Sequence, residues 1–306
     1  MNVSAPISKS DLAAPRPPAP EPEPEPFFGP VVLVGQARSG STLATALLNR
    51  GASGLVINDA YAGALAWDLG GLDAPGRRKT FARAALARIE ARSWDGPART
   101  APMHRASPFK AAGRRAAQAA GQAAAARGAG WVAIWGAMLS SAARAEGRGI
   151  WGWNTPGDHA HAAAILDAFP AARFVFVRRG VWSVLRSYKG LPAAWGRGRA
   201  RYHPALQARA WAGAAAAEAR LATALPEQVH RLSYERLTAH PEDELSRLAR
   251  FLDRQRIDAA PAEVTPNGSE PRALTRAEVW AARLALGREG RAAAGPAPRG
   301  EGLGAA

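Results

Sequence analysis

The chain has 306 residues, enough for one large domain or two small ones, and with 47% hydrophobic residues it can bury a sizeable core. It contains no cysteine, which excludes disulfides and any cysteine-based metal site or nucleophile. The formal net charge of +15 favours anionic partners such as nucleotides or acidic sugars. Because the arginines are scattered and are not interleaved with aromatic residues, we expect no nucleic-acid interface.

The first 29 residues contain repeated Pro-Glu pairs, which form neither a helix nor a sheet ladder. We expect residues 1–29 to be a disordered tail, followed by a folded domain over 30–258 and by an extension with a flexible tail over 259–306. The start of the chain lacks the apolar run of a signal peptide, and no later stretch is long and apolar enough to span a membrane. The sequence therefore predicts a soluble, cytoplasmic protein without membrane contact.

Two strand-to-helix units are visible along the folded part. Residues 31–34 form a short apolar run that is followed by a glycine-rich turn and a helical pattern of leucines. Residues 174–177 form a second such run, with a helix expected at 182–188. Together they predict a parallel sheet with helices on its faces. Weaker strand candidates are 54–57 and 228–232.

Between these units, residues 75–150 are rich in Ala, Arg and Gly and show no clear strand. We expect a helical segment there, with one well-defined helix at 131–143. Residues 275–286 also have helical character, although the sequence after 259 is polar and rich in proline.

The turn after the first strand carries the motif GQARSGST at residues 35–42. Its glycines allow a tight turn, and the backbone N–H groups of the turn and of the following helix then face one concavity that suits a phosphate or a sulfate. The candidate binding residues are Arg38, Ser39, Gly40, Ser41 and Thr42. The alternative is a glycine-rich turn that merely joins a strand to a helix.

The spacing of this motif is that of a P-loop, but Ser41 stands where the loop of an ATPase or kinase has lysine. The missing lysine argues against triphosphate chemistry, because that lysine reaches the terminal phosphates. Arg38 can supply a cation as a planar donor fork. A P-loop phosphotransferase acting on a small molecule remains the alternative function.

The second strand ends at Arg179, and Ser187 follows eight residues later on the next helix. Open α/β folds bind ligands at the carboxyl ends of their strands, so this cation and this hydroxyl can share a ligand. Alone the pair is a weak signal, since a surface arginine and a helical serine are common.

Together the two motifs resemble those of the PAPS-dependent sulfotransferases, where PAPS is 3′-phosphoadenosine 5′-phosphosulfate. In that family a loop after the first strand binds the 5′-phosphosulfate, and an arginine and a serine eight residues apart bind the 3′-phosphate. Arg179 and Ser187 match this pair, with Arg178 as the alternative if the register differs by one. Residues 151–156 (WGWNTP) and 232–237 (LSYERL) are similar to two further family segments. The loop is most similar to that of the bacterial and tyrosylprotein-type branch.

This resemblance implies an α/β, P-loop-type three-layer fold with a central parallel sheet flanked by helices, plus the helical segment on the acceptor side. It implies in-line transfer of a sulfuryl group from PAPS to a hydroxyl of a small molecule, glycan or peptide, with PAP as the product and no metal. Tyr234 is either a contact to the nucleotide or a core tyrosine at a strand end.

The tyrosylprotein-type enzymes carry a carboxylate base twenty-one residues after the loop arginine, which corresponds to Asp59. The alternatives are that Asp59 caps the next helix, or that the base is His159 or His161.

Three departures keep a degenerate nucleotide-binding fold without activity as a further alternative. Asn154 stands where that branch usually has lysine, and Gly180-Val181 replaces the usual Asp-Pro. The family's C-terminal glycine-rich loop is not visible, and residues 265–272 are its candidate replacement.

Overall fold

The computed structural model describes the chain in segments: 27–51, 54–74, 76–94, 109–191, 202–254, 256–257 and 272–297. Most of the predicted tail at 1–29 lies outside the described residues. So do residues 265–271 of the candidate replacement loop.

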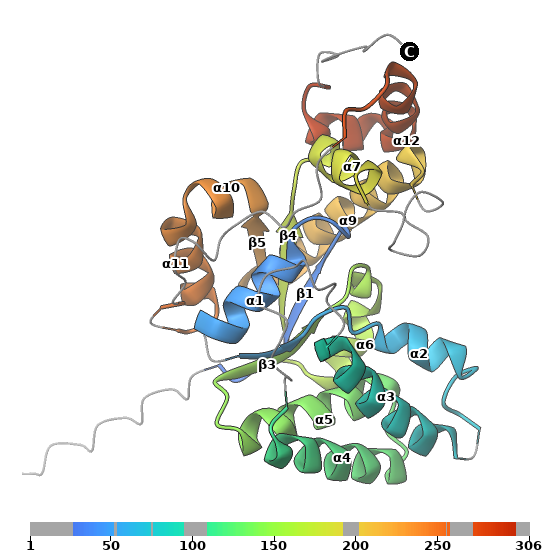
Figure 1. The fold of residues 1–306 in the computed structure, drawn as a ribbon, viewed down its shortest axis with the longest axis vertical. Coiled ribbons are helices and arrows are strands. Elements are labelled where there is room, and N and C mark those ends of the chain that lie inside the picture. Colours follow the sequence, from blue (N-terminus) through green and yellow to red (C-terminus); the bar gives the residue numbers. More distant parts are fainter. Residues whose placement is uncertain are drawn as a thin grey trace, which may run out of the picture.

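The core of the structure is a five-stranded sheet in the order β2-β3-β1-β4-β5, and each neighbouring pair of strands is parallel (Figure 1). All carboxyl ends therefore meet at one edge. This confirms the predicted α/β fold with a central parallel sheet flanked by helices. The strands are β1 Val31–Gly35, β2 Gly54–Ile57, β3 Ile150–Asn154, β4 Arg173–Arg178 and β5 Val229–Ser233.

Helices cover both faces of the sheet, because the strands are apolar on both sides. One face packs against α1 (Ser41–Gly51), α10 (Tyr234–Ala239) and α11 (Pro241–Phe251). The other face packs against the helices between β2 and β4. These are α2 Ala62–Asp68, α3 Arg77–Trp94, α4 Ala111–Ala126, α5 Trp131–Ala145, the 3₁₀ turn η3 Asp158–His161 and α6 Ala162–Ala168.

A third apolar cluster joins α7 (Val181–Lys189), α9 (Pro204–Ala224) and α12 (Arg276–Ala294), at the opposite end of the molecule from α4 (Figure 1). The 3₁₀ turn η4 Pro226–Gln228 leads from α9 into β5. The helix predicted at 182–188 is confirmed as α7. The helical character of 275–286 is confirmed as α12, which continues to Ala294 beyond a kink at Gly287. Among the described helices, none is long and apolar enough to cross a membrane.

The many alanine and glycine residues of the helical segment allow close helix packing in α4. Its buried residues Ala117, Gly121 and Ala124 recur on one face. A Cβ atom added at Gly121 would lie 2.8 Å from the Met138 side chain of α5, so the small residues let the two helices approach closely. The helix predicted at 131–143 is α5.

The sheet depends on one close approach between β1 and β3. Gly152 pairs with Val31, and a Cβ atom at position 152 would lie 1.8 Å from the Val31 carbonyl oxygen. No side chain fits there without moving the strand backbone.

We predict that Gly152→Ala lowers the free energy of unfolding by about 3 kcal/mol or more, because overpacking here displaces backbone. Gly213→Ala is the control, since this exposed residue of α9 has open space around it and a helical alanine is favoured by about 0.5–1 kcal/mol. Urea titration of both variants measures the difference. Equal stabilities would contradict this packing.

Candidate anion-binding site at the carboxyl edge of the sheet

The loop between β1 and α1 combines close packing with left-handed backbone. At Gly35, where φ is 133°, a Cβ atom would lie 2.7 Å from the Val177 carbonyl oxygen of β4. Arg38 and Gly40 have φ values of 72° and 101°. The helix then begins at Ser41, and the N–H groups of its first turn have no carbonyl partner within the helix. The loop thus has the backbone form of an anion cradle.

The two predicted motifs meet in the structure. The Nε atom of Arg38 donates a hydrogen bond to the Ser187 hydroxyl at 3.2 Å, across 149 positions of sequence. Nη1 of Arg179 donates to the Arg38 carbonyl oxygen at 3.3 Å. The loop after β1, the end of β4 and helix α7 therefore share one small region.

Tyr234, the first residue of α10, forms a wall of this region. Its ring lies 4.4 Å from the guanidinium carbon of Arg179 and so close to Gly40 that an added Cβ would sit 2.2 Å from it. The tyrosine is 8% exposed. It is a packed residue next to a strand end, as one prediction had it, and it lies against the Arg179 guanidinium; a contact to a nucleotide stays a prediction.

Arg178, the alternative to Arg179, belongs to a different environment. It forms an ion pair with Glu218 at 2.8 Å and lies over the Trp211 ring, both on α9. Trp211 also donates its indole N–H to the Arg179 carbonyl oxygen at 2.8 Å. Arg179 is therefore the residue that the end of β4 directs toward the loop.

The electrostatics of the region favour an anion. Burial lowers the pKa of the Arg38 guanidinium below its ordinary value, and the positive charge of Arg179 lowers this pKa further. The side chains of Tyr188 and Asp59 oppose the shift. Two guanidinium groups held together away from water repel each other, and a bound phosphate or sulfate would relieve that repulsion.

Asp59 lies in a turn with unusual backbone, between β2 and α2. Asp59 and Tyr61 both have left-handed φ values, 49° and 46°. Residues other than glycine rarely adopt this conformation, and it concentrates at functional sites. The N-cap residue of α2 is Tyr61, so Asp59 does not occupy the N-cap position of this helix.

A hydrogen-bonded chain connects Asp59 to Asn154, which sequence reasoning did not predict. The Asn154 amide nitrogen donates to Asn58 Oδ1 at 2.5 Å, and the Asn58 amide donates to Asp59 Oδ2 at 3.3 Å. Asn154 is fully buried at the end of β3. The residue at the family's lysine position thus contacts the turn that holds the candidate base.

The two histidines named as alternative bases lie in the 3₁₀ turn η3, where His159 is half-buried and His161 is exposed. His159 packs near the Phe176 ring, and burial lowers its pKa. His161 meets the Trp131 ring edge-on, with a centroid separation of 5.2 Å, and also lies against Gly63 of α2.

Several buried polar atoms around the loop lack a hydrogen-bond partner among the described residues. They are Ser39 Oγ, Arg179 Nε and Asn154 Oδ1. Ser39 is 1% exposed. Because an unpaired buried polar group costs free energy, such atoms indicate a place that a polar ligand completes. Ser39 Oγ and Arg179 Nε are donors and fit an oxyanion, whereas Asn154 Oδ1 is an acceptor that needs a donor from a ligand.

Comparison with known proteins assigns the family. The sequence model of the sulfotransferase family matches residues 30–258 of this chain. The chain belongs to the sulfotransferase family. Members of this family transfer sulfuryl groups, and the matched range includes both motifs.

Several solved structures of sulfotransferases are similar to the chain at low identity. The sulfotransferase domain from the curacin biosynthetic pathway is 18% identical, with a TM-score of 0.48 over 78% of this chain and 77% of that one. The sulfotransferase domain from the Synechococcus PCC 7002 olefin synthase is 17% identical, with a TM-score of 0.44 over 86% and 97%. Sulfotransferase STF9 from Mycobacterium avium is 16% identical, with a TM-score of 0.41 over 78% and 66%. Among curated proteins, none matches the sequence.

The structure shows how this sulfotransferase starts α7 without the usual Asp-Pro. Gly180 has φ −55° and ψ 135°, a conformation open to any residue, so its glycine is not needed for the turn. The helix has no side-chain cap of its own. Instead, Glu235 Oε1 accepts the Gly180 N–H at 2.8 Å, from the helix after β5.

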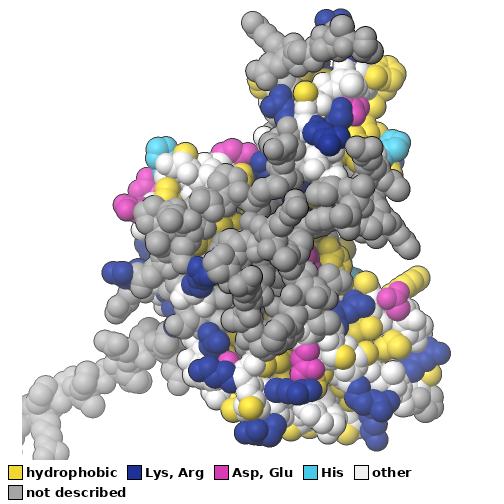
Figure 2. All heavy atoms as spheres, viewed as in Figure 1, with side chains coloured by type: hydrophobic (Ala, Val, Ile, Leu, Met, Phe, Trp, Pro, Cys, Tyr) yellow, Lys and Arg dark blue, Asp and Glu magenta, His cyan; other side chains and the backbone are white. Residues whose placement is uncertain are grey.

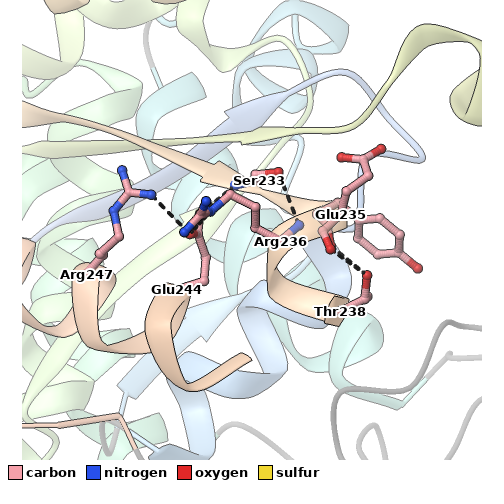
Figure 3. A network of polar contacts seen from close by, with 7 residues as sticks. Ser233, Glu235, Arg236, Thr238, Glu244 and Arg247 are labelled. Atoms are coloured by element: carbon pink, nitrogen blue, oxygen red, sulfur yellow. Dashed lines mark hydrogen bonds and ion pairs between the residues drawn. The ribbon is translucent and has the colours of Figure 1, made fainter. Parts of the chain in front are cut away.

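A buried carboxylate fixes the segment that carries Glu235. Glu244 of α11 is fully buried and accepts the Ser233 N–H at 2.9 Å. It also pairs with Arg236 and Arg247, each at 3.2 Å. Figure 3 shows these two arginines converging on Glu244 while the Glu235 carboxylate points away from them. The Glu235 carboxylate is thus directed away from this network and accepts the Gly180 N–H at the start of α7.

We predict that Glu235→Ala speeds amide hydrogen exchange in the first turn of α7 and lowers the free energy of unfolding by about 0.5–2 kcal/mol, the usual loss for a helix cap. In the double variant that also carries Gly180→Asp, both the exchange rate and the free energy of unfolding should be restored. An aspartate at the N-cap accepts hydrogen bonds from the N–H groups of its own helix. Glu242→Ala, which removes an exposed acid of α11, is the control. The assignment is wrong if exchange in α7 does not respond to Glu235→Ala.

Proposed function

We propose that this sulfotransferase transfers a sulfuryl group from PAPS to a hydroxyl of an acceptor by in-line displacement. The observation that carries the proposal is the hydrogen bond between Arg38 and Ser187, together with the one that Arg179 donates to the Arg38 carbonyl oxygen. It joins the loop that suits a phosphosulfate to the pair that suits a 3′-phosphate. A nucleotide carrying anions at both its 5′ and 3′ positions matches this arrangement.

The positions of the residues support the following binding roles. The N–H groups of Gly40, Ser41 and Thr42 and the hydroxyl of Ser39 face the 5′ end. Arg179 and Ser187 take the 3′-phosphate and thereby set the register of the nucleotide. Tyr234 supports the Arg179 guanidinium from below and borders the ribose side of the site.

When bound, PAPS supplies an activated sulfuryl group with PAP as the leaving group. The acceptor oxygen forms a bond to sulfur, and the bond from sulfur to the bridging phosphate oxygen breaks, leaving its electron pair on that oxygen. Asp59 takes the acceptor proton. Arg38 stabilises the negative charge that develops on the bridging oxygen. Asn154 and Asn58 hold Asp59 in its turn through the hydrogen bonds described above.

The acceptor class that this mechanism requires is a hydroxyl-bearing small molecule, glycan or peptide. It must reach Asp59, which lies between β2 and α2. The helical segment α2–α5 therefore forms the acceptor side, opposite the nucleotide half built by α7 and α10.

We predict that Arg179→Ala and Ser187→Ala each weaken PAP binding, by about tenfold or more for the arginine, because a hydrogen bond to a charged group contributes about 1.5–3 kcal/mol. Isothermal calorimetry with PAP measures this. Arg209→Ala, an exposed arginine of α9, is the matched control and should bind PAP as the unmodified chain does. Unchanged affinity in both site variants would remove the 3′-phosphate assignment.

We also predict that Asp59→Asn binds PAP normally but loses turnover by about 10²–10⁴-fold, the usual contribution of a general base. PAP release from PAPS with a panel of phenols and sugars measures turnover. Full activity of the variant would place the base elsewhere. PAP binding by the unmodified chain without turnover on any acceptor would indicate a nucleotide-binding sulfotransferase fold that lacks activity.

A further inference from the structure

Helix α12 lies outside the range that the family model matches, which ends at residue 258. It nevertheless packs along α9, which lies inside that range, and it forms one apolar cluster with α9 and α7 (Figure 1). The contact is a core of buried apolar side chains from all three helices: Val181, Val184, Leu185, Ala208, Trp211, Ala282 and Leu286. Helix α12 is therefore part of the folded unit that contains α7.

An ion pair joins the end of α7 to the start of α12. Lys189 Nζ lies 2.8 Å from Glu278 Oε2 and donates to the Ala273 carbonyl oxygen at 2.8 Å. The two side chains are 24% and 19% exposed. Such partial burial makes the pair stronger than an ordinary surface salt bridge.

Glu278 has a second task in its own helix. It forms a capping box with Thr275, accepting the Thr275 N–H at 2.6 Å while its own N–H donates to the Thr275 hydroxyl at 3.2 Å. The Glu278 carboxylate thus both caps the N-terminus of α12 and forms the ion pair with Lys189. A backbone hydrogen bond of 3.3 Å from Arg272 to the Arg186 carbonyl adds a further tie between the two segments.

These contacts affect the candidate site because α7 carries Ser187. The helix has nine residues, and helices that short are marginal in water without tertiary packing. Ser187, which meets Arg38, lies two residues before Lys189. Glu235 holds the start of α7 and the α12 contacts hold its end, so the position of the Ser187 hydroxyl depends on both.

We propose that residues 272–297 form a C-terminal clamp, with Lys189 and Glu278 as its positioning pair, that holds Ser187 in place for the 3′-phosphate of the nucleotide. The inference rests on the proposed function and deepens it. Neither Lys189 nor Glu278 touches the nucleotide in this account. They act through the end of α7.

The test compares two nucleotides that differ only in the 3′-phosphate, PAP and AMP, by calorimetry on the full chain. Lys189→Met keeps the length of the side chain and removes its charge. We expect it to weaken PAP by about three- to tenfold, the range set by the loss of about one hydrogen bond, while AMP affinity is unchanged. Lys189→Arg should restore the ratio of the two affinities.

Glu90→Gln is the matched control, since it breaks an ion pair of 2.5 Å with Arg114 on the distant helices α3 and α4. It should leave the ratio unchanged. A merely structural role for Lys189 would lower the melting temperature without a loss specific to the 3′-phosphate. Should Lys189→Met not fold, Glu278→Gln, which retains an acceptor for the capping box, is expected to lower the ratio in the same direction.

The outcomes separate the clamp from the function it rests on. If the unmodified chain prefers PAP to AMP but the folded variant shows the same ratio, the clamp is wrong and the proposed function stands. If the unmodified chain does not prefer PAP, the 3′-phosphate assignment fails at the outset.

Discussion

The site depends on two guanidinium groups held side by side at the carboxyl edge of the sheet. Arg38 and Arg179 come from different strand ends, and each is partly shielded from water. Their mutual repulsion is tolerated because the Ser187 hydroxyl, the Arg38 carbonyl and the Tyr234 ring hold both groups in place. A preformed pair of cations of this kind does not have to reorganise when an anion binds.

Strand order is what brings the two arginines together. β1 and β4 are neighbours in the sheet, with Gly35 in register with Val177, so the loop after β1 and the turn after β4 leave the same edge. The glycine at position 35 permits this contact because a side chain there would meet the β4 backbone. β3 lies on the other side of β1 and brings Asn154 to the same edge. The proposed nucleotide and acceptor halves thus share one line of strand ends, from β2 to β5.

The sequence predicted the parts of this arrangement that follow from local pattern. The loop at residues 35–42 and the strand that leads into Arg179 each have a recognisable local sequence pattern. Because parallel strands end at the same edge of a sheet, the loop and the end of this strand must then share an edge. Strand β3 was not predicted, because its sequence IWGWN shows no alternation and its glycine is required by the contact with Val31. The helical segment was predicted, but the buried face of α4 was not, since small residues pack helices closely without a strong hydrophobic period.

The supporting contacts could not be predicted, because each joins residues distant in sequence and of common types. Glu235 caps a helix 55 positions away, and Lys189 meets Glu278 across 89 positions. Asn154 was noted only as a missing lysine, yet its amide connects to the turn of Asp59. Local pattern thus identified the groups proposed to meet the nucleotide, and the folded structure was needed to find the residues that hold them.

A crystal structure of the chain with PAP tests the central claim most directly. The account predicts phosphate oxygens of the 3′ group at about 3 Å from Ser187 Oγ and the Arg179 guanidinium, with the 5′-phosphate on the N–H groups of residues 40–42. PAP bound in the reverse orientation, or at another part of the sheet edge, would contradict it.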